Sequence, residues 1–153
     1  MIASYKPLSE DVLEPCASMP SQAGRKTFCL DVGGDRTTKD VLKAGRYQGG
    51  INPMMNVANF PWRLRQGSRA IELVDMAQHG FPEIYLFSDA LSVLEKIGLG
   101  RPLYEDGMLF GEQYPGRQAK DVVMFPHEPV SDAGGCPTVV CIWSDGSHHE
   151  LYL

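Results

Sequence analysis

The feature that most constrains the fold is a series of start and stop signals between residues 84 and 98. The run Ile84-Tyr85-Leu86-Phe87 has the aromatic and β-branched content of a strand. Ser88 follows as a candidate N-cap, and Asp89 complements the positive end of a helix dipole. Gly98 stands where the helix would end. The pattern predicts a strand over 84–87 and a helix over 88–97, with Leu91, Val93, Leu94 and Ile97 facing the core.

Two further helices are predicted on weaker signals. Pro102 suits a first helical turn, although Gly107 and Gly111 lower the helix propensity of residues 102–114. Thr37 and Asp40 have the spacing of a capping box, in which each side chain accepts a bond from the other residue's backbone.

The predicted helix after Thr37 ends at Gly45, for which we expect a left-handed conformation. Asn52 followed by Pro53 predicts one or two helical turns through residues 54–57.

Strands are predicted where β-branched and aromatic residues gather, over residues 26–32, 69–76, 121–125, 138–143 and 148–153. Asp145-Gly146 is a strong hairpin signal between the last two. Strands and helices that do not alternate regularly favour the α+β class. We therefore expect a mostly antiparallel sheet of about five strands, with two or three helices packed on one face.

The first 25 residues are rich in Pro, Ser and Ala. Ser9 could cap a single helical turn through Leu13, which Pro15 would end. We therefore expect an N-terminal arm over residues 1–25 and a single α+β domain over residues 26–153.

Charge and composition exclude some classes of protein. A net charge of −5 argues against a nucleic-acid binder that works through its overall charge. No stretch approaches the roughly 20 apolar residues of a membrane span, and no signal peptide is visible. The four cysteines are scattered, which favours structural thiols over disulfides. We expect a cytoplasmic protein with no membrane partner.

Two separated segments resemble a group of small uncharacterised bacterial proteins. The first contains Gly45-Arg46-Tyr47, Asn52 and Phe60-Pro61, and the second runs from Leu99-Gly100-Arg101-Pro102 to Tyr114-Pro115. Leu103 departs from the group, where alanine is usual, and the chain ends without the aromatic-basic tail that often follows. The resemblance covers roughly residues 28–153 and implies a stand-alone domain. It implies no activity, because the group has none that is known.

An enzymatic alternative begins at Gly33-Gly34-Asp35-Arg36, which most simply forms a tight turn. The stretch from Asp35 to Gly45 faintly resembles the first catalytic segment of toxin-type ADP-ribosyltransferases. That resemblance implies a small enzyme acting on NAD, with Ser88 as the family's strand serine and Glu112 as its catalytic glutamate. The chain departs from that family on the preceding strand, where the expected arginine is replaced by Leu30, Asp31 or Val32.

Other polar residues give no catalytic or metal-binding constellation. His148 and His149 face opposite sides of a predicted strand, which leaves surface histidines as the simplest interpretation. Glu105-Asp106 is interpreted as the solvated face of a helix. We therefore expect no catalytic residues, no metal site and no cofactor, and whether the chain is an enzyme stays open, with a non-enzyme favoured.

The segment from Trp62 to Arg69 is the candidate partner-binding surface. Trp62, Arg63, Arg65 and Arg69 lie within eight residues that contain no acid. Trp and Arg are enriched at interface hot spots, and a local positive patch can receive a carboxylate or a phosphate. The alternative is a solvated loop with Trp62 folded into the core. The sequence predicts a small non-enzymatic domain that binds a macromolecular partner, most simply a protein, through these four residues.

Overall fold

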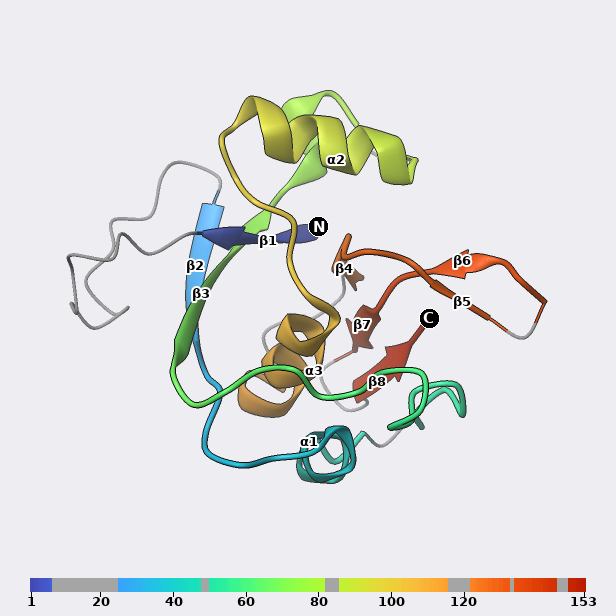
Figure 1. Cartoon of the computed structure of the whole chain (residues 1–153). Helices are drawn as coiled ribbons and strands as arrows, with labels where there is room; N and C mark the ends of the chain where they lie inside the picture. The colour runs from blue at the N-terminus through green and yellow to red at the C-terminus, as the bar shows by residue number, and fades with distance from the viewer. Residues whose placement is uncertain (7–24, 48–49, 82–85, 116–121, 133, 146–148) are drawn as a thin grey trace.

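The structure, a computed structural model, describes residues 1–6, 25–47, 50–81, 86–115, 122–132, 134–145 and 149–153 (Figure 1). Its centre is a six-stranded sheet in the order β2-β3-β1-β4-β7-β8. Neighbouring strands are antiparallel except β1 and β4, which are parallel. The predicted α+β class with a largely antiparallel sheet is confirmed. The strands are β1 Ile2–Lys6, β2 Arg25–Asp31, β3 Ser68–Val74, β4 Val123–Met124, β7 Cys141–Ser144 and β8 His149–Tyr152.

The N-terminus forms the strand β1 inside this sheet, so the prediction of an arm is wrong for residues 2–6. β1 pairs with β3 from Ile2–Val74 to Lys6–Ala70, and Ile2 also faces Met124 of β4. Ile2, Ala3 and Ser4 are fully buried. A strand buried on both faces shows no alternation of polar and apolar residues, which hid it in the sequence. The predicted turn at Ser9–Leu13 lies outside the described residues.

Helices lie on both faces of the sheet. Because neighbouring residues of a strand point to opposite faces, Ile2 and Ala3 belong to different layers of the core. Ala3 packs in the main core with helix α3 (Tyr104–Gln113), and helix α1 (Thr38–Ala44) contributes to the same core. Ile2 packs with helix α2 (Phe87–Lys96) in a second cluster. Figure 1 shows α2 on one side of β1 and β3, and α1 and α3 on the other.

Helix α2 begins earlier than predicted. Leu86 is its N-cap, and the Leu86 N–H donates to the Asp89 carboxylate at 2.8 Å. Ser88 therefore lies inside the first turn and is exposed. The predicted strand over 84–87 is wrong for Leu86 and Phe87, while residues 84 and 85 lie outside the described residues. The helix ends as predicted before Gly98, whose φ is 72°.

Helix α3 is the most deeply buried element, with all residues from Tyr104 to Gly111 buried. Its glycines allow the close packing of the helix. A Cβ on Gly107 would lie 2.7 Å from Val140 Cγ1, and a Cβ on Gly111 would lie 2.4 Å from the Tyr47 hydroxyl. The two residues that weakened the helix prediction are therefore the ones that let α3 approach its neighbours.

Helix α1 begins with the predicted capping box. The Thr37 N–H donates to the Asp40 carboxylate at 2.9 Å, and the Asp40 N–H donates to the Thr37 hydroxyl at 3.3 Å. The predicted left-handed end at Gly45 is wrong, because its φ is −64° and Arg46 takes the positive φ of 48° instead. A glycine is needed at position 45 for another reason, because a Cβ there would lie 2.3 Å from the Tyr47 ring.

The remaining described elements are short. A two-stranded ribbon pairs β5 (Val130–Ser131) with β6 (Pro137–Thr138), and the 3₁₀ turn η2 covers Met76–His79. The final β7–β8 hairpin is confirmed as an antiparallel pair that closes at Ser144–His149, and its residues 146–148 lie outside the described part. Cys29, Cys136 and Cys141 are free thiols. In the part of the chain that the structure describes, no helix is long and apolar enough to cross a membrane.

Candidate binding groove

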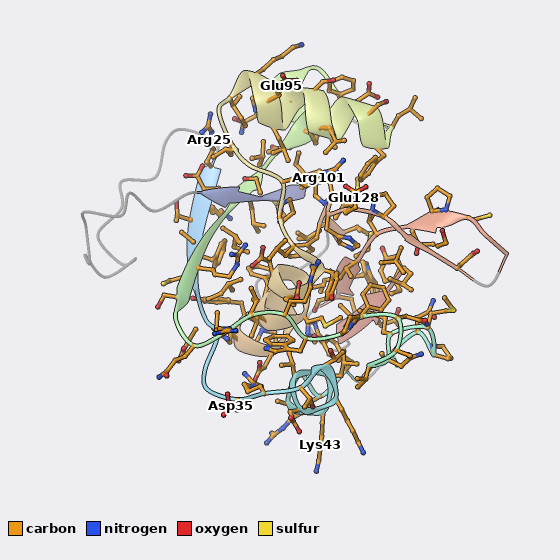
Figure 2. The ribbon with its side chains drawn as sticks, in the orientation of Figure 1. Arg25, Asp35, Lys43, Glu95, Arg101 and Glu128 are labelled. Atoms are coloured by element: carbon orange, nitrogen blue, oxygen red, sulfur yellow. The ribbon has the colours of Figure 1, made fainter. Side chains whose placement is uncertain are left out.

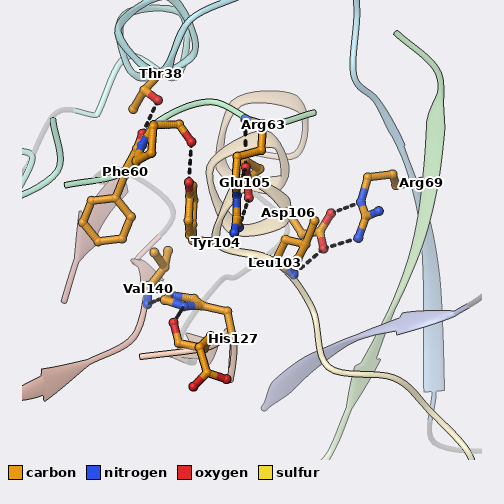
Figure 3. A network of polar contacts seen from close by, with 12 residues as sticks. Thr38, Phe60, Arg63, Arg69, Leu103, Tyr104, Glu105, Asp106, His127 and Val140 are labelled. Atoms are coloured by element: carbon orange, nitrogen blue, oxygen red, sulfur yellow. Dashed lines mark hydrogen bonds and ion pairs between the residues drawn. The ribbon is translucent and has the colours of Figure 1, made fainter. Parts of the chain in front are cut away.

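Two of the predicted partner-binding arginines contact buried acids of α3. Arg63 binds Glu105 through Nε and Nη2, each at 2.9 Å, and its backbone N–H donates to the same carboxylate at 3.1 Å. The Arg69 guanidinium forms a two-point pair with Asp106, including Nη2 to Oδ2 at 2.8 Å (Figure 3). Both carboxylates have no exposed side-chain surface. The interpretation of Glu105-Asp106 as a solvated helix face is wrong, because these acids neutralise the arginines of the preceding segment.

The same network fixes the segment before β3. The Thr38 hydroxyl donates to the Phe60 carbonyl, and the Tyr104 hydroxyl donates to the Pro61 carbonyl (Figure 3). The Arg63 guanidinium also lies over the Tyr104 ring, 4.1 Å from its centroid. Burial, with the nearby Glu105 charge, raises the pKa of Tyr104 to about 12. An irregular segment is thereby held in one position by side chains of α1 and α3.

Trp62 and Arg65 differ from the two paired arginines. Trp62 is half-buried and packs against the main core, and its indole Nε1 is buried without a partner among the described residues. This geometry corresponds to the alternative interpretation of the segment, in which Trp62 folds into the core. Arg65 is exposed, and no described acid pairs with it. Of the four predicted residues, Arg65 alone presents its charge to solvent without a partner in the described part of the chain.

The two described histidines of interest are both core residues. His127 is buried, and its Nε2 accepts from the Val140 N–H at 2.8 Å while Nδ1 lies 2.6 Å from the Glu128 carbonyl. His149 stacks on Tyr47 at 4.8 Å, and its Nε2 lies 2.9 Å from the Gly111 carbonyl. Burial lowers the pKa of both histidines. The prediction of a surface histidine is therefore wrong for His149, and His148 lies outside the described residues.

The residues of the enzymatic alternative are brought together only in part, because Arg36 contacts Glu112 while Ser88 lies elsewhere. Arg36 binds Glu112 at 2.6 Å, and the predicted turn before it is formed, with the Gly33 N–H donating to Asp31 at 2.9 Å. Ser88 lies on α2, which packs on the other face of the sheet from α3 and Glu112. The family's serine belongs on a strand, whereas Ser88 lies in a helix.

The candidate site is a groove between α1 and residues 51–57, with a volume of about 370 Å³. Leu42 and Met55 are nearly buried at its base, and Val57 is 52% exposed. Lys39 and Lys43 are exposed side chains of α1 that also line it, and Figure 2 shows Lys43 extending away from the body of the molecule. The groove, defined by Lys39, Leu42, Lys43, Ile51, Met55, Asn56 and Val57, combines an apolar base with two cations.

The groove offers few hydrogen-bonding groups. The side-chain oxygen of Asn56 accepts from the N–H groups of Ala58 and Asn59, and its amide donates to the Pro53 carbonyl. The acceptor positions of Asn56 are therefore occupied within its own segment, as is one of its two amide N–H donors. Lys39 and Lys43 form no ion pair with a described residue, so their ammonium groups are the charged groups of the groove that remain for an occupant.

The walls of the groove are held from both ends. Thr38, in the first turn of α1, bonds to the Phe60 carbonyl at the end of the opposite wall. At the other end, Ile51 pairs with Leu151 of β8, and the Asn52 N–H donates to the Leu151 carbonyl at 3.4 Å. The first contact joins α1 to the segment that forms the opposite wall, and the second fixes the start of that wall to β8. Both favour a preformed site over one that an occupant must assemble.

Comparisons with models of protein families, with curated proteins and with solved structures found no match. The resemblance to a bacterial group therefore stays a prediction. Among the described residues, no group of three or more His, Cys, Asp or Glu side chains could hold a metal ion.

The groove and the predicted partner-binding residues Trp62, Arg63, Arg65 and Arg69 belong to different segments of the chain. The signal for the groove was present: Lys39 and Lys43 are one helical turn apart, which places them side by side on α1. The sequence could not show which cations are neutralised, because Glu105 and Asp106 are about 40 residues away from their arginines.

Proposed function

We propose that the protein is a non-enzymatic binding domain that takes a short segment of a protein partner into the groove between α1 and residues 51–57. One observation carries the proposal: an apolar groove is lined by two lysines that form no ion pair with a described acid. Enzyme sites usually bring several polar groups to one point, whereas the third polar side chain here, Asn56, is occupied within its own segment.

The chemistry of the groove favours a protein segment with apolar and acidic side chains. Apolar side chains would cover Val57 and Met55, and carboxylates would meet the two lysines. The net charge of −5 repels acidic partners from the rest of the surface, which favours this position for their attachment. We do not propose the NAD-dependent alternative, because Ser88 and Glu112 lie on opposite faces of the sheet.

The test is a selection from a random peptide library displayed on phage, followed by affinity measurements on two matched variants. Val57→Asp places a charge in the groove, and Val122→Asp changes another exposed valine, 40% exposed, outside it. Loss of one apolar contact of about 1.5–3 kcal/mol predicts at least a roughly tenfold weaker affinity for Val57→Asp. Val122→Asp should bind like the wild type. Selected peptides that bind Val57→Asp as tightly as the wild type would contradict the proposal.

A further inference from the structure

We infer that the segment bound in the groove is an amphipathic helix carrying two carboxylates one helical turn apart. This inference rests on the proposed function. It follows from the backbone hydrogen bonds of the groove wall, from the spacing of the two lysines and from the shape of the apolar base.

The groove wall has few backbone groups left for a partner. Within residues 52–56, the N–H groups of Met54, Met55 and Asn56 donate to atoms of Asn52 and Met54. The carbonyls of Pro53 and Met54 accept from the side-chain amides of Asn56 and Asn59. The opposite wall is α1, where the Val41 N–H donates to the Thr37 carbonyl and the Val41 carbonyl accepts from the Gly45 N–H.

An extended segment in this groove would leave its own N–H and C=O groups facing apolar side chains. Each such group costs free energy when it is buried without a partner. A helix satisfies these groups internally and presents only side chains to the groove. The groove wall therefore favours the helical conformation of a peptide over its extended conformation.

The lysines set the position of the charges. Residues at i and i+4 of a helix have Cβ atoms roughly 5–6 Å apart, and Lys39 and Lys43 have this relationship on α1. Two carboxylates one turn apart on a bound helix have the same spacing. The carboxylate of Asp40, the acid next to Lys39, accepts from the N–H and hydroxyl of Thr37 and forms no ion pair with either lysine.

Apolar residues of the bound helix would cover the base of the groove. Met55 and Leu42 lie deepest, and Val57 leaves about half of its surface exposed. Two or three leucines on one face, at spacings of three and four residues, would place apolar side chains over these residues. With so few apolar contacts we expect a weak complex, with a dissociation constant on the order of 10 µM.

The experiment measures fluorescence anisotropy with four synthetic peptides of 14 residues. The first carries leucines on one face with two flanking glutamates at i and i+4. The second moves the glutamates to the opposite face, the third replaces them by lysines, and the fourth has a central proline that prevents the helix. The wild type should bind the first at least about tenfold more tightly than each of the others.

Charge reversal provides the decisive control. Lys39→Glu/Lys43→Glu changes two exposed side chains, so folding should be unaffected, and a thermal melt verifies this. The variant should bind the glutamate peptide at least about tenfold more weakly than the wild type does. It should bind the lysine peptide with an affinity within about threefold of that of the wild type for the glutamate peptide.

The outcomes separate the inference from the proposed function. Equal binding of the first two peptides, or of the proline peptide, would overturn the inference, while dependence on Val57 would preserve the proposed function. Binding of decanoate that abolishes peptide binding and depends on Val57 would overturn both in favour of a fatty-acid site. Peptide affinities that change neither in Val57→Asp nor in the charge-reversed variant would also overturn the inference and the proposed function.

Discussion

Arg63 and Arg69 each hold a carboxylate that lies out of contact with water, and this single fact changes the meaning of the basic segment around them. Glu105 and Asp106 have no exposed side-chain surface, so each needs its cation to remain charged in the core. Hydrogen bonds to Glu105 raise the pKa of Arg63 above its ordinary value. The main role of Arg63 and Arg69 is therefore to stabilise the fold.

Alanine substitutions separate these arginines from Arg65. Arg63→Ala and Arg69→Ala each leave a buried carboxylate without its partner, which predicts a loss of about 3–5 kcal/mol in the free energy of unfolding. Arg65→Ala is the matched control and should change it by less than about 0.5 kcal/mol. Urea unfolding measures all three. A midpoint for Arg69→Ala equal to that of the wild type would refute the structural role.

The two buried histidines predict a loss of stability in mild acid. Burial lowers the pKa of His127 and His149, so the folded state keeps them neutral while the unfolded chain takes up protons below about pH 6.5. Stability is therefore full above pH 6.5 and falls as the pH drops, by at most about 1.4 kcal/mol per pH unit for each histidine.

The measurement compares the free energy of unfolding at several values between pH 5 and 7.5 for the wild type and for His127→Gln/His149→Gln. The substitutions lower stability overall, and the quantity compared is the slope against pH. The variant should have the shallower slope. Equal slopes would show that these histidines do not carry the acid sensitivity.

Helix α3 organises the elements around it, because it contacts β2, β7, β8 and α1. Gly107 faces Phe125 and Val140, and Gly111 faces Tyr47. Tyr47 is in turn fixed by its hydrogen bond to the Met108 carbonyl at 3.2 Å and by its stack on His149. Tyr47, which follows α1, is thus positioned by the close approach of α3.

A single methyl group tests this packing. Gly107→Ala places a Cβ 2.7 Å from a fully buried valine, and overpacking of this kind costs about 1–3 kcal/mol despite alanine's higher helix propensity. Gly34→Ala, where a Cβ meets nothing within 4 Å, is the control. We expect a lower melting temperature for Gly107→Ala alone. A stabilising Gly107→Ala would mean that helix propensity outweighs the contact.

Elements with a local signal could be predicted from the sequence, and those that depend on distant partners could not. The Thr37–Asp40 box starts α1 within four residues of chain, and the β7–β8 hairpin needs only neighbouring strands. β1 forms a strand by pairing with β3, which lies about 70 residues away in the sequence. The burial of the Glu105 carboxylate likewise depends on a distant residue, Arg63. The groove arises between α1 and a segment without regular structure, which no periodicity reveals.

On the scale of the whole molecule, the surface divides into cations that are neutralised and cations that remain. Arg36, Arg63, Arg69 and Arg101 all pair with acids. Lys39 and Lys43 beside the groove pair with no described acid. In a protein of net charge −5, the proposal of an acidic segment rests on these two lysines lying beside an apolar base, a combination that the exposed Arg65 does not share in the groove described above.

The most direct test of this account is nuclear magnetic resonance of the ¹⁵N-labelled protein during titration with the 14-residue peptide that carries glutamates at i and i+4. The backbone amide shifts should change mainly at residues 39–43 and 51–57, and far less for Lys39→Glu/Lys43→Glu. Shifts centred on Trp62 and Arg65, or shifts that persist in the charge-reversed variant, would contradict it.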